Sequence, residues 1–332
     1  IISEGKADMV ALGRALLADP ELVAKMKEGR SAEVRPCIAC NQGCIDRLLG
    51  GQSVACLVNA RTGFELERAI EKAAAPKKVF VIGGGPGGLE AARVARARGH
   101  SVLLAEKAAS LGGKVEAAAT PPGKEEFGLV TPFLVQQVQK LGVETCLNAA
   151  NVQELVNQYQ PDVVINAIGA EPITPAIPGL NSARVLFAED ALLNKNGVGC
   201  QVAVLGGGMV GMETALFLAK SGKKVTVIEM LGEVARDVGP LVKPLLLQEV
   251  EKANVDVFVN AEVTDITPNW VEFDSGGKRH QIAADTVILA VGYRPRNLDL
   301  KASCQIVAIG DAKEARNALH AIHEGFLAGA AV

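Results

Sequence analysis

The sequence predicts an α/β protein that contains two Rossmann-like, three-layer dinucleotide-binding domains. Two stretches, VFVIGGGPGGLEAA and VAVLGGGMVGMETA, each join an apolar strand to a helix through a glycine loop. The composition agrees, because 49% hydrophobic residues and 35 glycines suit tightly packed α/β layers, and 332 residues suggest about two domains. A third observation is a group of four cysteines that precedes the first glycine loop.

Charge and hydropathy argue against several classes of function. The net charge of −3 gives no electrostatic basis for binding nucleic acid or an anionic membrane. No apolar run approaches the roughly 20 residues that span a bilayer. We therefore expect an intracellular redox protein, located in the cytoplasm.

The first 36 residues read as the end of a larger unit. Residues 8–12 are expected to form a strand, Gly13 and Arg14 a turn, and residues 21–28 a helix after the Asp19-Pro20 start signal. One βα unit cannot bury both faces of its strand, so its partners should precede Ile1. We expect the chain to be truncated at both ends.

Four cysteines follow with the spacing Cys37-x2-Cys40-x3-Cys44-x11-Cys56. Three thiolates on one tight loop and a fourth from downstream provide the four ligands that a [4Fe-4S] cluster needs. A structural zinc ion also takes four thiolates, but its usual pattern has two C-x2-C pairs. Disulfides would suit a small secreted scaffold better than this composition. Cys146, Cys200 and Cys304 lie in apolar, strand-like contexts and are interpreted as core residues.

The next stretch, FELERAIEKAAAPKK, is expected to form a short helix and a linker, with a domain boundary near Pro76. The first glycine motif, Gly83-x-Gly85-x-x-Gly88, then lies between a strand and a helix. Its glycines permit a tight turn, the approach of a pyrophosphate and close helix–strand packing, in that order. Glu106 ends the following strand, at the spacing where a carboxylate meets a ribose hydroxyl.

The second motif repeats this device. Gly206-x-Gly208-x-x-Gly211 is followed by Glu229, again 18 positions after the last glycine. Two such units predict one bound FAD and one diffusible nicotinamide nucleotide. The first copy is the better FAD site, because it is followed by LGG, ending at Gly113, and the chain later gives VAIGDA.

In VAIGDA, Gly310 and Asp311 stand at the end of a strand and before a helix. An Asp there can bond to the ribityl or pyrophosphate region of the flavin, or can cap the helix, and the two roles are compatible. In the second copy, Glu229 favours the 2′-hydroxyl of NADH over the 2′-phosphate of NADPH, and no Arg follows until Arg236.

Further strands are expected within residues 161–172 and 285–295, each ending in a glycine turn that closes one of the two sheets. Residues 256–285 alternate in polarity and are expected to form an antiparallel meander with a turn from Ser275 to Lys278. His320 and His323 share a helix face, and with no third ligand nearby we interpret them as packing or surface residues.

The order of RPCIACNQGC, GGGPGGLEAA, LGGK, PGKEEF, a second glycine motif, IGDA and AIHEGFLAG resembles the multidomain relatives of old yellow enzyme. These relatives are the 2,4-dienoyl-CoA reductases, 2-enoate reductases and trimethylamine dehydrogenases, and the resemblance covers essentially the whole chain. It implies a C-terminal portion. Residues 1–36 would be the last βα unit of an FMN-binding TIM barrel, with Gly13 and Arg14 at the FMN phosphate.

The same resemblance implies the remaining organisation. Residues 37–75 would hold the cluster, residues 76–190 and 297–332 would bind FAD, and residues 191–296 would bind NAD(P)H. The implied function is electron transfer from NADH through FAD and the [4Fe-4S] cluster to FMN, which would reduce an activated alkene such as a 2-enoate or 2,4-dienoyl-CoA. Substrate-binding and catalytic residues are expected in the barrel, outside this sequence.

Three alternatives are weighed against that function. A disulfide reductase shares the two-nucleotide architecture, but no cysteine pair lies beside either glycine motif. An amine dehydrogenase-type relative would pass electrons outward and use its nucleotide module differently. The two complete glycine motifs, each with its acid, argue against this alternative. A stand-alone electron-transfer subunit would have no reason to begin with an incomplete βα unit.

Overall fold

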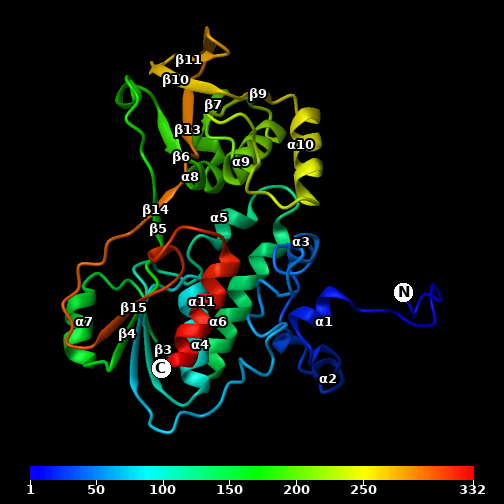
Figure 1. Ribbon diagram of the computed structural model, residues 1–332, viewed down its shortest axis with the longest axis vertical. Coiled ribbons are helices and arrows are strands. Elements are labelled where there is room, and N and C mark those ends of the chain that lie inside the picture. Colours follow the sequence, from blue (N-terminus) through cyan, green and yellow to red (C-terminus); the bar gives the residue numbers. More distant parts are fainter. The chain divides into compact units, whose positions relative to one another are not determined.

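A computed structural model describes residues 1–332, which form two compact units (Figure 1). The first unit consists of residues 1–113, 129–168 and 298–332, and the second of residues 114–128 and 169–297. Each contains a five-stranded parallel sheet packed with helices. The predicted α/β fold with two Rossmann-like domains is therefore confirmed.

The sheet of the first unit has the strand order β15-β4-β1-β2-β3. Its strands are β1 (Lys78–Ile82), β2 (Ser101–Ala105), β3 (Glu144–Cys146), β4 (Val163–Asn166) and β15 (Gln305–Ala308). The order reverses between β1 and β4, and ligands of open parallel sheets bind at the carboxyl ends of the strands at such a point. The first glycine motif directly follows β1.

Helices cover both faces of this sheet. They are α4 (Pro86–Ala97), α6 (Val130–Lys140), α7 (Val152–Tyr159) and α11 (Ala318–Ala331). Figure 1 shows α4, α6 and α11 on one side of the sheet and α7 on the other. Phe80 and Ile82 of β1 pack in one buried cluster with Val156 of α7. Alternate residues of β1 thus serve opposite faces, which explains why the whole strand is apolar.

The segment before β1 contains little regular structure. It holds α1 (Arg14–Ala18), α2 (Leu22–Lys27) and α3 (Ile45–Leu49), with a 3₁₀ turn at Ser31–Glu33. The predicted helix over residues 21–28 is confirmed by α2. The predicted strand over residues 8–12 is wrong: these residues pair with no strand and are exposed. The helix expected after Phe64 is also wrong, because residues 65–68 form only a turn before an extended chain.

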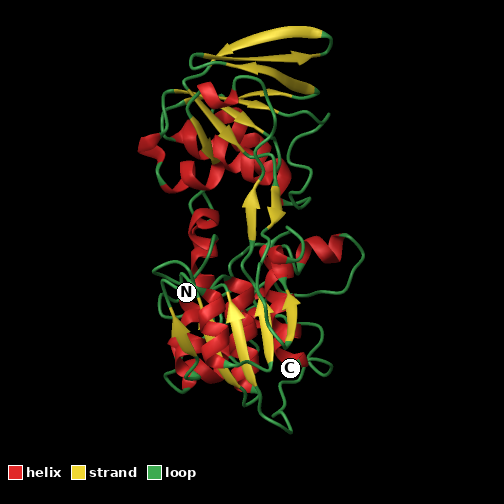
Figure 2. Ribbon diagram, turned by 90° about the vertical axis from the view of Figure 1, so that its left-hand side faces the viewer, coloured by secondary structure: helices red, strands yellow, loops and turns green.

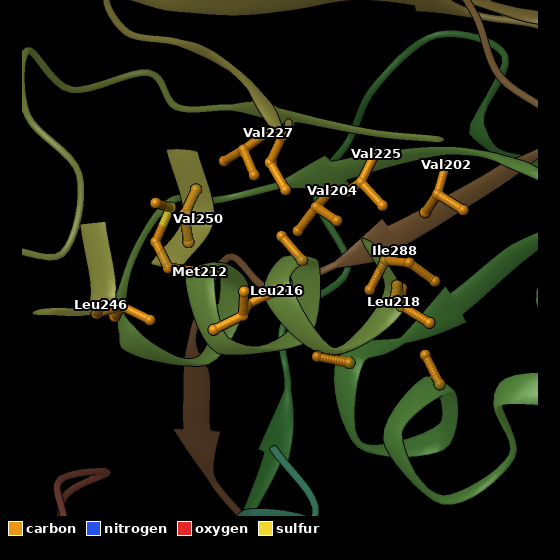
Figure 3. Close-up of a cluster of buried hydrophobic side chains, with 14 of the residues drawn as sticks. Val202, Val204, Met212, Leu216, Leu218, Val225, Val227, Leu246, Val250 and Ile288 are labelled. Carbon is orange, nitrogen blue, oxygen red and sulfur yellow. The ribbon is translucent and has the colours of Figure 1, made fainter. Parts of the chain in front are cut away.

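The sheet of the second unit has the equivalent order, β6-β13-β7-β8-β9. Its strands are β6 (Val185–Phe187), β7 (Gln201–Leu205), β8 (Lys224–Ile228), β9 (Asp256–Phe258) and β13 (Thr286–Leu289), and its helices are α8 (Ala188–Leu193), α9 (Met209–Lys220) and α10 (Val242–Lys252). Figure 3 shows Val204 and Val227 of the sheet facing Met212 and Leu216 of α9, beside Val250 of α10. This buried core holds α9, and with it the second glycine loop, against β7.

Antiparallel strands complete the second unit (Figure 2). β10 (Ala261–Ile266), β11 (Trp270–Ser275) and β12 (Lys278–Ala283) form the predicted meander, and Ser275 pairs with Lys278 across the predicted turn. β5 (Ala170–Pro172) pairs with β14 (Tyr293–Pro295), and α5 (Val115–Ala119) also belongs to this unit.

The two compact units are divided at Gly169 and Leu298, because β5 pairs with β14 and β6 with β13. Strands β5 and β6 therefore belong to the second unit, although they precede its glycine motif in the sequence. The functional domain boundaries expected at residues 36, 75, 190 and 296 stay predictions. None of the helices combines the length and the apolar character that a membrane-spanning helix requires.

Candidate functional site

The first three cysteines lie on an irregular loop that ends at α3. Cys44 is the residue immediately before this helix, and Cys37 and Cys40 precede it without regular structure. Ala39 and Asn41 have positive φ values of 51° and 59°, which side chains other than glycine rarely adopt. These left-handed turns coil the backbone tightly between the cysteines.

Gly43 brings the fourth cysteine to this loop. A Cβ at Gly43 would lie 2.9 Å from both the Cα and the carbonyl carbon of Cys56, so only glycine allows the two segments to approach so closely. The N–H of Ala55 donates a hydrogen bond of 2.7 Å to the carbonyl of Gly43. The spacing of the cysteines did not indicate this contact, which decides where Cys56 lies.

All four cysteines line one small pocket that is partly open to solvent. The other lining residues include Arg14 and Asn41, which are joined by a hydrogen bond of 2.9 Å. The four side chains are half-buried free thiols, and no disulfide is present. No three His, Cys, Asp or Glu side chains converge closely enough to hold a single metal ion.

Burial and backbone donors determine the chemistry of these thiols. Burial raises the pKa of Cys40 to about 11, although a backbone hydrogen bond from Gln42 acts to lower it. Burial also raises the pKa of Cys56, which accepts backbone hydrogen bonds from Val58 and Asn59. Thiols of this kind deprotonate when they bind metal, and N–H donors to the sulfurs help to set the potential of an iron–sulfur cluster.

The cysteine segment is fixed to the first 36 residues by polar contacts. Thr62 donates a hydrogen bond of 2.7 Å to the carbonyl of Leu17 at α1. The Asp19 carboxylate accepts the Arg35 N–H at 2.8 Å and pairs with the ammonium group of Lys25 at 2.7 Å. These contacts hold α1 and α2 against the cysteine segment without the predicted strand.

His323 joins the cysteine segment to α11. Its Nε2 lies 2.8 Å from the carbonyl of Cys56, and its Nδ1 lies 3.3 Å from the guanidinium of Arg68. A carbonyl only accepts and a guanidinium only donates, so the ring is neutral with its proton on Nε2. Burial and the charge of Arg68 lower the pKa of His323, despite the opposing bond to Cys56. Sequence reasoning interpreted this residue only as a packing or surface residue.

Buried charges lie beneath the same segment. Glu90 of α4 is fully buried and accepts two hydrogen bonds of 2.7 Å from Arg93. Burial lowers the pKa of Arg35 to about 10, while Glu90, Cys56 and Asp19 favour its charged form. Sequence reasoning missed these residues, because nothing in their local pattern distinguishes them from surface charges of a helix or a loop.

The first glycine loop has the geometry of a phosphate-binding turn. Gly83 has a φ of 106°, and a Cβ there would lie 2.3 Å from the carbonyl oxygen of Ala167. A Cβ at Gly88 would lie 1.9 Å from the carbonyl oxygen of Gly83, so α4 packs directly on the turn. At Gly85 a Cβ would meet nothing closer than Gly113, at 4.0 Å. The backbone is therefore open to a ligand at this one position of the motif.

The Glu106 carboxylate stabilises the first glycine loop through hydrogen bonds to backbone N–H groups. It accepts the N–H groups of Gly84 at 2.6 Å and of Ala108 at 2.8 Å. Both bonds orient the carboxylate at the end of β2, next to the position where the ribose of a bound dinucleotide is expected. The predicted residues Gly83, Gly85, Gly88, Glu106 and Gly113 are thus brought together.

The C-terminal helix brings the remaining residues of this site to the same end of the sheet. A Cβ at Gly87 in the first turn of α4 would lie 2.8 Å from the carbonyl oxygen of Ala321 in α11. Gly310 donates its N–H to Glu324 at 2.8 Å, and Asp311 accepts the N–H of Arg316 at 3.1 Å. β4 lies between β15 and β1 in this parallel sheet, so Gly310 and Asp311 follow the same carboxyl edge that carries the glycine motif.

The second glycine loop repeats this geometry. Gly206 has a φ of 102°, and a Cβ at Gly211 would lie 1.9 Å from the carbonyl oxygen of Gly206. The Glu229 carboxylate accepts the N–H groups of Gly207 at 2.5 Å and of Leu231 at 2.7 Å. The predicted residues Gly206, Gly208, Gly211 and Glu229 therefore also lie together, at the end of β7 and β8.

Glu213 adds a charge to α9 that sequence reasoning did not single out. Its carboxylate pairs with the Lys124 ammonium group at 2.7 Å. Burial raises the pKa of Glu213, and the nearby Asp237 acts in the same direction, while Lys124 opposes both. The first copy has an acid at the equivalent position, Glu90, the fifth residue of α4, but this acid pairs with Arg93 of its own helix.

Residues 77–310 match the pyridine nucleotide-disulphide oxidoreductase family. The chain belongs to this family. The match contains both glycine loops and both acids, and it supports FAD and NAD(P)H as cofactors of a flavin-dependent oxidoreductase.

Individual relatives agree with the predicted resemblance. The chain is 39% identical to a bilirubin reductase from Mediterraneibacter gnavus, over 99% of this chain and 52% of that protein. It is 37% identical to a cinnamate reductase from Clostridium sporogenes, over 98% of this chain and 50% of that protein. The chain thus spans about half the length of these relatives.

A solved structure of a 2-naphthoyl-CoA reductase, in complex with 2-naphthoyl-CoA, shares the fold throughout. Its TM-score is 0.94 at 32% sequence identity, and the match covers 100% of this chain and 51% of that protein. The predicted resemblance to multidomain flavin-dependent reductases is confirmed by these comparisons.

Proposed function

We propose that this chain is the electron-transfer portion of an NADH-dependent reductase. The proposal assigns three sites. The cluster ligands are Cys37, Cys40, Cys44 and Cys56. The FAD site consists of Gly83, Gly85, Gly88, Glu106, Gly113, Gly310 and Asp311. The NADH site consists of Gly206, Gly208, Gly211 and Glu229.

The observation that supports this proposal most strongly is the pocket lined by all four cysteines. Four thiols around one hollow, two of them with backbone N–H donors, form a donor set that fits a [4Fe-4S] cluster. When bound, FAD would accept a hydride from NADH, and the cluster would pass single electrons toward FMN. The residues of this chain bind and orient these groups.

The contact between Cys56 and His323 gives the chain a role in positioning. The cysteine segment is attached through His323 to α11, which packs against the first turn of α4 at the proposed FAD site. The cluster ligands and the flavin-binding helices therefore share one compact unit. Such an arrangement supports electron transfer between two groups held by the same unit.

Glu229 supports NADH over NADPH. Its carboxylate is fixed by two backbone N–H groups and is 9% exposed. A 2′-phosphate beside it would bring two negative charges together in a partly desolvated place. We therefore expect NADPH to be a poorer electron donor.

The whole protein is proposed to act on an activated alkene. The relatives are named as reductases of bilirubin, of cinnamate and, for the solved structure, of 2-naphthoyl-CoA. Each name denotes a conjugated substrate. FMN bound through Gly13 and Arg14, in a barrel of which residues 1–36 form the end, is part of this proposal. Arg14 lines the cysteine pocket, so the cluster would lie next to that FMN site. Cytoplasmic location stays a prediction.

The test uses the whole 332-residue chain, purified without oxygen and reconstituted with iron, sulfide and FAD. We expect four irons per chain, an absorbance of the cluster and bleaching of the flavin by NADH. Cys37→Ser should remove the cluster absorbance and leave the reduction of an artificial dye by NADH within about twofold. Cys146→Ser, which changes a half-buried thiol outside the pocket, is the matched control and should retain both signals.

Three results would contradict the proposal in different ways. Zinc bound in the absence of iron would show that the four cysteines hold a structural metal ion and not a cluster. Failure of NADH to bleach the bound flavin would favour the amine dehydrogenase-type alternative, in which electrons leave toward another protein. Loss of dye reduction together with the cluster in Cys37→Ser would contradict the separate roles given to the two parts of the chain.

A further inference from the structure

The two glycine loops differ at the residue that faces the helix N-terminus. In the second copy, the N–H of Met209, the first residue of α9, donates a hydrogen bond of 2.8 Å to the Asp237 carboxylate. The same carboxylate lies 3.5 Å from the position of a Cβ on Gly208. In the first copy, the first helical residue is Pro86, which has no N–H, and the space above Gly85 is open.

The loops that follow the two acids correspond residue by residue. The N–H of Gly112 donates to the carbonyl of Gly84 at 2.8 Å, and the N–H of Ala235 donates to the carbonyl of Gly207 at 2.7 Å. Both donors stand six positions after their acid. Asp237 therefore corresponds to Lys114, two positions further on. The flavin copy has a cation at this position and the nicotinamide copy has an anion.

Asp237 is placed by a loop that is itself well anchored. Ala235 is fully buried, has a positive φ of 53° and belongs to the core cluster of the second unit. Val238 is buried in the same cluster, and Val234 packs against it. These contacts hold the backbone of residues 234–238 against the glycine loop. The packing of this loop therefore determines where the Asp237 carboxylate lies.

The position of this carboxylate has a consequence for ligand binding. A helix N-terminus attracts anions, and the first N–H groups of a helix after a glycine loop are the donors that a dinucleotide pyrophosphate uses. In this chain the first of those donors already has an anionic partner from the same unit. A pyrophosphate that binds here must displace the Asp237 carboxylate from the N–H of Met209. It is also repelled by this carboxylate, because both groups are negatively charged.

We propose that Asp237 competes with the pyrophosphate of the nicotinamide nucleotide and so makes binding at the second site weaker and more readily reversible. This inference rests on the proposed NADH site. It gives a physical reason for a difference between two copies of one motif: FAD must stay bound, whereas NAD⁺ must leave after each hydride transfer. The acid at position 237 makes the second copy a site for exchange.

The test measures the binding of ADP-ribose to the FAD-loaded chain by calorimetry. ADP-ribose contains the pyrophosphate but no nicotinamide, so it binds without reducing the flavin. Asp237→Ala should bind ADP-ribose about two- to fivefold more tightly, as expected for removing one charge at a helix N-terminus. Asp237→Asn, which keeps an acceptor oxygen and loses the charge, should lie between Asp237→Ala and the unaltered protein.

Glu233→Gln is the matched control. It removes one negative charge from the same loop, but Glu233 is exposed and pairs with Lys243 and not with α9. We expect its affinity for ADP-ribose to change by less than about 1.5-fold, since exposed charges at a distance are screened. FAD content should be unchanged in all three variants.

The outcomes separate this inference from the function on which it rests. Unchanged or weaker ADP-ribose binding in Asp237→Ala, in protein that still bleaches with NADH, would overturn the inference alone and leave Asp237 as a cap that stabilises α9. Equal tightening in Glu233→Gln would also overturn it, because general electrostatics would then suffice. If neither NADH nor ADP-ribose bound to any form, the proposed nucleotide site and this inference would both be wrong.

Discussion

Gly43 is the residue on which the geometry of the cysteine pocket depends. The sequence pattern places three cysteines on one loop but does not say where the fourth lies. The close approach of Gly43 to the backbone of Cys56 supplies that information. A glycine with an ordinary negative φ is therefore required here by space and not by backbone conformation.

Gly43→Ala should separate Cys56 from the other three cysteines. The new Cβ would lie 2.9 Å from backbone atoms of Cys56, which cannot move aside as a flexible side chain can. We expect the reconstituted variant to lose at least about half of its cluster absorbance and to keep its flavin. Gly50→Ala is the control, because its Cβ would lie 3.4 Å from the nearest atom and should be tolerated. Full cluster content in Gly43→Ala would contradict this account.

The Glu90–Arg93 pair is a second feature at the residue scale. Both residues are buried, and two hydrogen bonds join their side chains. Burial disfavours the charged form of Glu90, but the charge and hydrogen bonds of Arg93 outweigh it and lower the pKa of the carboxyl. Each charge therefore depends on the other.

Glu90→Ala should cost about 3–5 kcal/mol of unfolding free energy, because it leaves the Arg93 charge buried without its partner. A double variant, Glu90→Leu with Arg93→Met, should cost much less. Since the folded pKa of Glu90 is lowered, its contribution to stability is complete above the ordinary carboxyl pKa of 4.5 and is lost as the pH falls through the lowered value. Denaturant unfolding from pH 7 to pH 3 measures both effects; equal losses in the single and double variants would contradict the prediction.

At the scale of elements, α11 connects the proposed cluster and flavin sites. It packs against α4 through glycines: a Cβ at Gly325 would lie 2.2 Å from the carbonyl oxygen of Gly87, and one at Gly329 would lie 2.6 Å from that of Ala91. Through His323, α11 also contacts the cysteine segment. The sequence signal for this packing, small residues four apart in HEGFLAGAA, is visible only once the partner helix is known.

Gly325→Ala should push α11 away from α4 and weaken both flavin binding and stability. The contact is with backbone, so the helices must shift, and core overpacking of this kind costs about 1–3 kcal/mol. Leu327→Ala on the exposed face of α11 is the control and should change the unfolding free energy by less than about 0.5 kcal/mol. Thermal unfolding and the FAD content after gel filtration measure the two effects; a variant as stable and as flavin-rich as the control would contradict the packing argument.

At the scale of the whole molecule, the chain forms two units, each with its own parallel sheet and core. The proposed cluster and FAD residues belong to the first unit. The proposed NADH residues belong to the second unit. Ligands should therefore stabilise the units separately, because a ligand stabilises the structure that binds it.

Calorimetry of the reconstituted chain should show two thermal transitions. NADH or ADP-ribose at about 100 times its dissociation constant should add about 2.7 kcal/mol to the unit that binds it and raise only that transition. Removing iron with a chelator should lower the other transition. A single transition that moves with every ligand would show that the two units unfold together and would contradict this separation.

The sequence could predict a large part of the fold and of the site residues, for local reasons. The glycine motifs, the acid 18 positions later and the apolar strands are regular within each βα unit, so their geometry follows from neighbouring residues. The strand over residues 8–12 was wrong, because a strand depends on partners for its hydrogen bonds and that segment has none here. The helix after Phe64 was wrong, because a single turn forms, closed by the N–H of Arg68 on the carbonyl of Phe64, and the chain then extends.

By itself the sequence determined the fold class, the two nucleotide loops and the identity of the four clustered thiols, since each depends on residues close together in the chain. Only the tertiary structure decided how Cys56 joins the other cysteines at Gly43, how His323 reaches its carbonyl from α11, and how Asp237 comes to face Met209. These contacts join residues far apart in sequence. Their positions are fixed by the packing of whole helices and sheets, which no local pattern records.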